Sequence, residues 1–406
     1  MSTTPVYIQY LPYIILYFFL NNVLLPHGLL YTALLSPLFI YWIYKQHGIV
    51  SMLKWSLVFI IPIPFQLFQG VDMPVYLKST ALVLTAYIFL FAAIRAVSFL
   101  NDAMEEVFKK VLAINSILLA IALLFLPFSS LRPVFWNSIP ISPNIPPFPR
   151  LDMLAYEPSH YALLLSPVFI FFIIMAISGK LKHPFIYVIA TLIPLTLSFS
   201  FGIIGAIMIA VIIVLIIFRR SFPAAQLNVW IYCFIIGIAL FIAISWFWPS
   251  NPLWLRITNI FAGADTSTKG RLFNSFMFAG DLIARHNMPF GVGPGQVKLL
   301  AHDLIINHYQ YTGEFAEVVR IPNSMAEMLA TYGIYGFVLK LFFEIYFFVK
   351  TKVYTNIYAL GLFIFIFLYQ FTGSFVVNVA ELGIWALVYN YRPEVFQLKK
   401  GKRISA

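Results

Sequence analysis

Long apolar runs separated by short polar turns dominate the chain. A helix that crosses the hydrocarbon core of a bilayer needs about 20 apolar residues. The runs therefore predict twelve membrane-spanning helices, at roughly 7–25, 28–44, 52–69, 79–99, 110–128, 160–178, 184–200, 202–218, 228–248, 325–348, 354–371 and 374–390. No polar stretch is long enough to fold alone, so residues 1–406 are expected to form a single all-α membrane domain.

Two polar segments interrupt this pattern, and we name them the first large loop (129–159) and the second large loop (249–324). Prolines crowd the first loop, which blocks helix formation and favours extended backbone. The second loop contains an amphipathic stretch, residues 272–286, whose apolar positions recur at helical spacing. This stretch is expected to form a helix that lies on the membrane surface.

The composition agrees with a polytopic membrane protein. Hydrophobic residues make up 61% of the chain and charged residues only 10%, with a mean hydropathy of +0.89. Soluble domains carry about 25% charged residues. The single cysteine, Cys233, lies in an apolar run and is expected to be a small buried residue.

Basic residues mark every second connection between the predicted spans, and short loops rich in Lys and Arg stay in the cytoplasm. They are Lys45, Lys54, Lys109, Lys110, Lys180, Lys182, Arg219, Arg220, Lys350 and Lys352, followed in the tail by Lys399, Lys400, Lys402 and Arg403. Both termini are therefore expected inside and both large loops outside. The net charge of +11 reflects this topology and contact with anionic lipids, and is no sign of nucleic-acid binding.

Four residues of the large loops are candidates for chemistry at the outer membrane face. Arg150, Arg271 and Arg320 are suited to bind an anion, because a guanidinium stays charged and binds phosphate with two donors. Contact with lipid headgroups is the alternative for each arginine. Glu157 is the leading candidate for a general base, although its place before Pro158 also suits the start of a helix.

Other polar residues carry weaker signals. His302 and His308 are further candidate bases, with simple solvation as the alternative. Glu381 stands alone in the last predicted span, where an acid is either functional or paired with an external arginine. No cluster of His, Cys and carboxylate has the spacing of metal ligands, so we expect neither a catalytic metal nor another cofactor.

Three motifs have ready structural interpretations. Lys340 and Glu344 are one helical turn apart and predict an ion pair. Ser324 and Glu327 match a capping box at the start of the tenth span. The glycine-rich segment 289–295 is either a flexible turn or a weak phosphate-cradle signal.

The ordered set of motifs between residues 148 and 336 resembles the bacterial O-antigen polymerase and O-antigen ligase superfamily. The matching pieces are Arg150 with Glu157-Pro158, Leu197-Ser-Phe-Ser200 with Gly202 and Gly205, Gly270-Arg271-Leu272, Pro289-Phe-Gly-Val-Gly293, and Asn323 with Glu327, Gly333 and Gly336. Two positions depart from the family pattern. Phe201 stands where an arginine often follows the Ser-x-Ser stretch. Pro322 stands where ligases carry a histidine, which favours a polymerase.

The resemblance implies a fold like that of the C-type membrane glycosyltransferases, with about twelve spans and two large periplasmic loops, in the bacterial inner membrane. The implied enzyme joins polyprenyl-diphosphate-linked repeat units by glycosyl transfer, without a metal. Its implied partners are this lipid-linked oligosaccharide, membrane lipids and a chain-length regulator protein. Catalytic roles are implied for Arg150, Glu157, Arg271, Arg320, His302 and His308, and substrate binding for Arg256, Lys269, His160, Asn323 and Glu381.

Other functions stay open at this point. An O-antigen ligase would move the glycan to a lipid A core instead of a repeat unit. A lipid-linked oligosaccharide flippase or another transporter is expected to hold charges in a central cavity within its spans, whereas here they concentrate in two external loops. A non-catalytic assembly partner is a third class.

Overall fold

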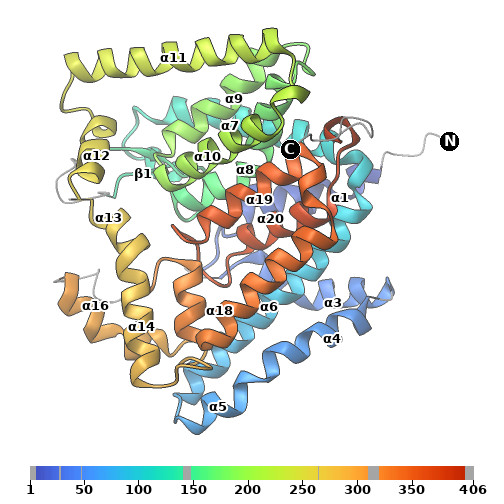
Figure 1. Ribbon diagram of the computed structural model, residues 1–406, viewed down its shortest axis with the longest axis vertical. Helices are drawn as coiled ribbons and strands as arrows, with labels where there is room; N and C mark the ends of the chain where they lie inside the picture. Colours follow the sequence, from blue (N-terminus) through green and yellow to red (C-terminus); the bar gives the residue numbers. More distant parts are fainter. Residues whose placement is uncertain are drawn as a thin grey trace.

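The computed structural model describes residues 6–26, 29–46, 48–139, 148–263, 265–309 and 320–397. This part of the chain is almost entirely helical (Figure 1). Six of its helices are long and apolar enough to cross a membrane, and five further apolar helices have 10–17 residues. The protein is therefore an all-α protein with membrane-spanning helices, as the apolar runs predict.

The elements of the first half, up to the second large loop, are α1 (Val6–Ile15), η1 (Leu16–Leu20), α2 (Tyr31–Leu34), α3 (Ser36–Lys45), α4 (Ile49–Ile60), α5 (Pro62–Phe68), α6 (Met73–Phe99), η2 (Asn101–Ala103), α7 (Met104–Phe125), η3 (Arg132–Val134), β1 (Trp136–Asn137), β2 (Arg150–Leu151), α8 (Pro158–Ile177), α9 (Pro184–Leu197), α10 (Phe201–Ile217), η4 (Arg219–Ser221) and α11 (Ala224–Phe247). Strands β1 and β2 pair antiparallel and pin the two ends of the first large loop together.

The second half begins with helices of the second large loop and ends with three longer helices. Its elements are α12 (Pro252–Phe261), α13 (Thr266–Lys269), η5 (Gly270–Asn274), α14 (Ser275–Arg285), α15 (Val297–Leu300), α16 (His302–Tyr309), α18 (Ser324–Lys350), η6 (Val353–Thr355), α19 (Ile357–Tyr369), α20 (Val379–Asn390) and η7 (Glu394–Phe396). The segments η1 and η5 are single π-helical turns, which shift the helix face and recur at functional sites.

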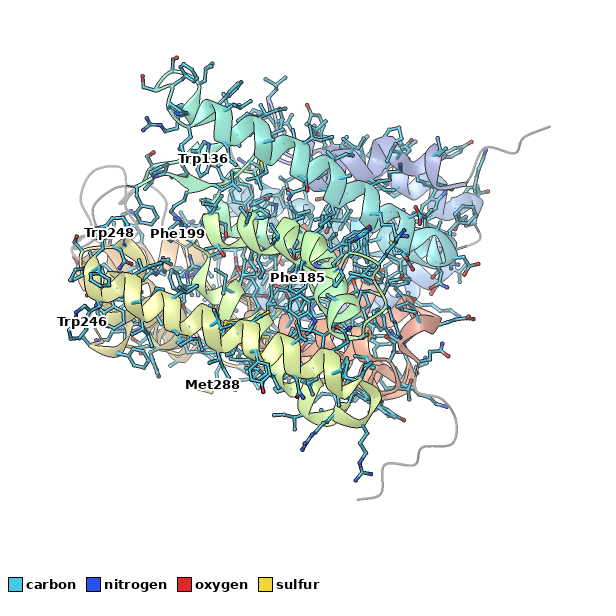
Figure 2. All side chains as sticks on the ribbon, turned by 90° about the horizontal axis from the view of Figure 1, so that it is seen from above. Trp136, Phe185, Phe199, Trp246, Trp248 and Met288 are labelled. Carbon is cyan, nitrogen blue, oxygen red and sulfur yellow. The ribbon has the colours of Figure 1, made fainter. Side chains whose placement is uncertain are left out.

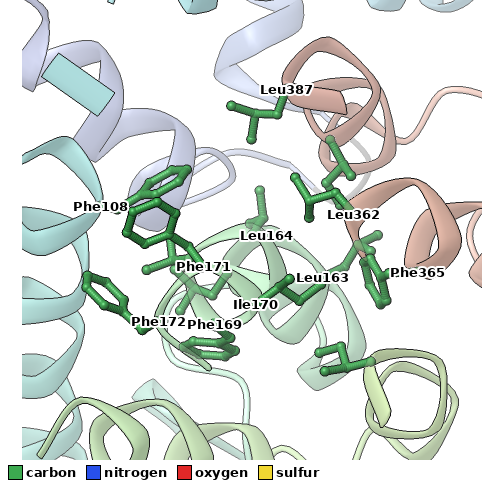
Figure 3. Close-up of a cluster of buried hydrophobic side chains, with 14 of the residues drawn as sticks. Phe108, Leu163, Leu164, Phe169, Ile170, Phe171, Phe172, Leu362, Phe365 and Leu387 are labelled. Carbon is green, nitrogen blue, oxygen red and sulfur yellow. The ribbon is translucent and has the colours of Figure 1, made fainter. Parts of the chain in front are cut away.

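Helix α8 is the centre of the main core. Its apolar residues point in all directions, and 94% of its span is buried inside the protein. Figure 3 shows Phe171 of α8 against Phe108 of α7, and Leu163 on the other side of α8 beside Phe365 of α19. A helix that is apolar all round must be enclosed by protein or by lipid, and α8 is enclosed by protein.

Helix α11 is the opposite case. It lies along one side of the molecule (Figure 1), and none of its span is buried. Trp246 and Trp248 lie on the outside of the molecule at its end (Figure 2). Cys233 is exposed on this helix, so the expectation of a buried cysteine is wrong. Its apolar surroundings in the sequence reflect contact with lipid rather than with the core.

The second large loop builds a small core of its own. The amphipathic stretch forms η5 and α14, as expected. The apolar face of α14, including Phe278 and Leu282, packs against Ile321 and against Ala326 and Ala330 of α18. This face was expected to lie on the membrane surface, and the structure instead buries it on protein.

Helix α18 is interrupted at Gly333, which adopts φ 65° and ψ −162°. Figure 1 shows the two halves meeting at an angle near the bottom of the view. The predicted tenth span is thus two helices. The sequence did not indicate the break, because its pattern stays apolar on both sides of Gly333. Asn323 rather than Ser324 caps the first half, since its Oδ1 accepts from the Ala326 N–H at 2.9 Å. The capping-box prediction is wrong in this respect.

The glycine-rich segment 289–295 supports that break. The N–H groups of Ile334 and Tyr335 donate to the carbonyls of Met288 and Pro289, at 3.1 and 2.9 Å. A Cβ atom on Gly291 would lie 2.4 Å from the Gly333 nitrogen. The glycines therefore allow two backbones to touch, and neither a phosphate cradle nor a flexible turn describes this segment.

Candidate functional site

An open pocket lies where both large loops meet the ends of α8, α18, α19 and α20. It is lined by Glu157, Ser159, His160, Leu163, Arg271, Arg320, Ile321, Pro322, Tyr369, Ser374, Phe375 and Asn378. We name it the polar pocket. Four of the residues singled out in the sequence meet here. They come from chain segments more than 100 residues apart, so only folding brings them together.

The enclosed part of the polar pocket is small, with a volume of about 30 Å³. This is room for about two water-sized groups. The pocket is therefore sized for the polar atoms of a reacting group, and the rest of any larger substrate must lie outside it.

Glu157 is held ionised at the rim of the pocket. It stands just before the first residue of α8, where the sequence placed it, and its Oε1 accepts from the Ser159 hydroxyl at 2.5 Å. Its Oε2 lies 3.8 Å from Arg320 Nη2. Burial raises the pKa of Glu157, but the Ser159 hydrogen bond and the charges of Arg320 and Arg271 outweigh burial and leave the pKa below its ordinary value. A carboxylate so stabilised is a weak base.

His160 is buried in the wall of the pocket, with only 2% of its surface exposed. Its ring stacks on Tyr156 at 4.4 Å between centroids. Neither ring nitrogen has a hydrogen-bond partner among the described residues. A buried polar group without a partner is costly and calls for an explanation, and a ligand in the pocket supplies one.

Arg271 is positioned by the π-helical turn η5 and by Asn323. The Asn323 amide donates to the carbonyl oxygens of Arg271 and Phe371, at 2.8 and 2.6 Å. Its oxygen caps α18, and the residue is fully buried. Asn323 was a candidate for substrate binding, but all its hydrogen-bonding groups serve the backbone. Asn323 therefore links the second large loop to the segment that follows α19.

Arg320 completes the rim of the pocket. Its guanidinium faces the Glu157 carboxylate, and its Cζ lies 5.8 Å from the centre of the Phe375 ring. The segment that follows is fixed, because the N–H groups of Ser324 and Met325 donate to the carbonyls of Gly373 and Gln370 at 3.0 and 3.2 Å. The backbone that follows Arg320 is thus held in place by hydrogen bonds to the connection between α19 and α20.

Arg150 and Arg256 extend the positive charge beyond the pocket lining. Arg150 donates to the Ser198 carbonyl at 3.3 Å. Burial, and then the charge of Arg256, lowers the pKa of Arg150 to about 10. Arg256 lies 3.5 Å from Asp265, and its Cζ is 5.0 Å from the centre of the Phe201 ring. Burial also lowers the pKa of Arg256, while Asp265 opposes this shift. The repulsion between Arg150 and Arg256 would be relieved by an anion bound near both of them.

Three other candidates lie away from the pocket lining. His302 pairs with its neighbour Asp303 at 3.0 Å on an exposed helix. His308 is 3.1 Å from Asn274 Nδ2. Lys269 is exposed at the end of α13. Neither histidine is placed to act as the base at this pocket.

Glu381 has a partner that the sequence did not indicate. Its Oε1 lies 2.7 Å from Lys340 Nζ, not beside an external arginine. The predicted pair of Lys340 and Glu344 is also present but longer, at 4.0 Å. Glu381 is buried behind the pocket and does not line it.

Several pocket residues were missed by sequence reasoning. Tyr369, Ser374, Phe375 and Asn378 come from the connection between α19 and α20. A signal existed, since polar residues are concentrated at 370–378 between two apolar runs. The predicted spans 354–371 and 374–390 absorb nearly all of this uncharged segment, so it did not stand out as part of a site.

Comparison with known proteins adds no family assignment. In the described part of the chain, no group of three or more His, Cys, Asp and Glu side chains is close enough to hold a metal ion. No protein-family model matches the chain, and no curated protein sequence matches it significantly.

Proposed function

We propose that this protein is an O-antigen polymerase, a membrane glycosyltransferase that joins polyprenyl-diphosphate-linked repeat units on the periplasmic face of the bacterial inner membrane. In this proposal the chain has twelve spans, with both termini in the cytoplasm, in the manner of C-type membrane glycosyltransferases. The observation that carries the proposal is the convergence of Arg271, Arg320, Glu157 and His160 on one pocket, with Arg150 and Arg256 beside it.

The arginines suit the leaving group of this reaction. As the glycosidic bond to the diphosphate breaks, the bonding electrons move to the diphosphate and its negative charge grows. Preorganised donors aimed at developing charge are typically the largest catalytic contribution. Arg150 and Arg271 supply such donors from half-buried positions, where water screens them poorly, and Arg320 adds a donor from the exposed rim.

His160 is our assignment for the general base. The hydroxyl of the acceptor sugar attacks the anomeric carbon of the donor, a new C–O bond forms, and the hydroxyl proton must leave. An imidazole nitrogen without a partner inside the pocket can take that proton. Glu157, the leading candidate from the sequence, is already engaged by Ser159 and Arg320.

Glu157 then acts as a positioning residue. Its carboxylate holds Arg320 at the rim when the site is empty. A diphosphate then binds an arginine that is already held in place, so binding does not have to order this side chain. Loss of Glu157 is therefore expected to weaken donor binding more than it slows the chemical step.

An O-antigen ligase is the second candidate, because it would use the same donor. Pro322 lines the pocket at the position where ligases carry a histidine, which argues for the polymerase. A flippase or other transporter is less favoured. The intramembrane residues Lys340, Glu344 and Glu381 pair with one another and do not line the polar pocket.

The test uses purified protein in nanodiscs with lipid-linked repeat units, read as a ladder on a gel. A ladder that survives chelator supports the proposed metal-independent polymerase. Transfer of one glycan onto a lipid A core without a ladder would favour the ligase. Absence of both products, with transport of the intact lipid-linked glycan, would refute the enzyme. A chain-length regulator, the proposed protein partner, is added in a second reaction to test for a change in ladder length.

A further inference from the structure

A large apolar cavity lies among the N-terminal helices, apart from the polar pocket. Its volume is about 560 Å³, within the range of small-molecule binding sites. The walls are built by α1, η1, α3 and α6, with Pro167 of α8 and Gly383 and Leu387 of α20. Figure 1 shows these N-terminal helices beside the C-terminal helix α20. We name this space the apolar cavity.

Small side chains leave the apolar cavity open. Ala92, Ala93 and Ala96 of α6 line it, together with aromatic rings such as Phe39 of α3 and Phe89 of α6. Phe89 and Leu100 both line the cavity, and eleven residues of helix rise by about 16 Å. The cavity is therefore long enough to take an extended hydrocarbon chain.

The end of the cavity near η1 carries unusual polar groups. Thr32 lines the cavity and is 2% exposed. Within the described ranges, its hydroxyl, the Ser36 hydroxyl and the Asn21 amide nitrogen have no hydrogen-bond partner. Buried polar groups are normally paired. Of these three residues only Thr32 lines the cavity, so its hydroxyl is the one that can bind a ligand there.

A continuous set of contacts joins this end of the cavity to the polar pocket. The Asn22 amide, with its nitrogen toward Leu154 and its oxygen toward Tyr156, bonds the Leu154 carbonyl and the Tyr156 N–H at 3.2 Å each. Tyr156 stacks on His160. On α8, Leu163 lines the polar pocket and Pro167, one turn further along, lines the apolar cavity.

We propose that the apolar cavity holds the isoprenoid tail of a polyprenyl-diphosphate substrate whose diphosphate is bound at the polar pocket. This inference rests on the proposed function. Leu163 and Pro167 place the two sites one helical turn apart along α8, so a lipid whose diphosphate lies in the polar pocket has the apolar cavity within reach of its single chain. Burial of that chain adds affinity in proportion to the apolar area removed from the surroundings.

The test fills the cavity and varies the tail. Ala96→Phe and Ala93→Phe narrow it, and Ala81→Phe is the matched control, because Ala81 is exposed on the same helix and does not line the cavity. Each variant is assayed with repeat units carried on undecaprenyl diphosphate and on a ten-carbon prenyl diphosphate. Wild type should favour the long chain. Ala96→Phe should raise KM for the long chain by about tenfold and leave the short-chain KM unchanged.

Short-chain activity also reports whether each variant is folded. If both cavity variants keep the wild-type KM for the long chain, the tail site is wrong while the enzyme assignment stands. If wild type polymerises neither substrate, the proposed function fails instead, and a binding measurement then tests the cavity alone. A diazirine-bearing polyprenyl diphosphate should label α3 and α6 in wild type and not in Ala96→Phe. Equal competition by a phospholipid such as phosphatidylglycerol would overturn the proposal, because an ordinary lipid would then occupy the cavity.

Discussion

The ammonium group of Lys340 lies 2.7 Å from Glu381 Oε1 on the neighbouring helix α20. The same ammonium donates to the Ser324 hydroxyl at 2.9 Å. Ser324 and Lys340 belong to the two halves of α18, on either side of the break at Gly333. One buried charge pair therefore holds both halves of the broken helix against α20, next to the segment that carries Arg320.

Lys340→Met should destabilise the protein by about 3–5 kcal/mol, because it leaves the Glu381 carboxylate buried without a partner. The double variant Lys340→Met/Glu381→Leu should recover much of this loss. Unfolding in detergent, followed by tryptophan fluorescence, measures both. Lys350→Met is the control, since Lys350 is exposed on the same helix. Equal stability of the single and double variants would show that the pair is not coupled.

Arg271→Ala and Arg150→Ala should each slow polymerisation by about 100- to 1,000-fold while leaving membrane insertion intact. Lysine at either position should rescue only part of the rate, because a point charge lacks the paired donors of guanidinium. The matched control is Arg285→Ala, an exposed arginine of the same loop outside the pocket. In cells, short products should replace the ladder. Normal ladders from both alanine variants at normal protein levels would remove the arginines from the site.

His160→Gln should lower kcat by about 100- to 10,000-fold, the usual contribution of a general base, with little change in donor binding. Glu157→Gln should instead raise the donor KM, because Arg320 then loses the carboxylate that holds it at the rim of the pocket. His286→Gln, at an exposed position, is the control. A loss of kcat in Glu157→Gln alone would return the base role to the carboxylate.

Gly333→Ala should unfold or strongly destabilise the region around the pocket. The backbone at Gly333 lies in a region that only glycine adopts readily, and a Cβ there would lie 2.5 Å from backbone atoms of Gly291 and Pro289. Gly237→Ala is the counterpart, since a Cβ at Gly237 meets no atom within 4 Å. It should be neutral or stabilise its helix by about 1 kcal/mol. Protein yield and thermal stability in detergent distinguish the two.

Topology is tested by thiol labelling in a Cys233→Ser background, since the native cysteine is exposed on α11. Leu300→Cys, in the second large loop, should react with a membrane-impermeant thiol reagent from the periplasm. Lys182→Cys, between α8 and α9, should react only after the cells are opened, because basic short loops stay in the cytoplasm. The reverse pattern would move the polar pocket to the cytoplasmic face.

Much of the helical framework was predictable, because apolar runs and their polar boundaries are local signals. The helix at 158–177 follows directly from such a run, which begins at Pro158. The polar pocket was predictable only in part. Arg271, Arg320, Glu157 and His160 stand out because charged and polar side chains are rare in this chain, whereas Tyr369 and Phe375 carry no such contrast, because aromatic residues are common throughout it.

Tertiary structure alone decided how those residues are used. Asn323 resembles a ligand-binding residue in the sequence, yet its amide nitrogen donates to the carbonyls of Arg271 and Phe371 and is not available to a ligand. Glu381 looks isolated along the chain and is paired with Lys340 across two helices. The sequence by itself determined which segments leave water and become helices, because burial of apolar surface depends on local composition. Partnerships between polar groups depend on which helices become neighbours, and that is set by packing over the whole chain.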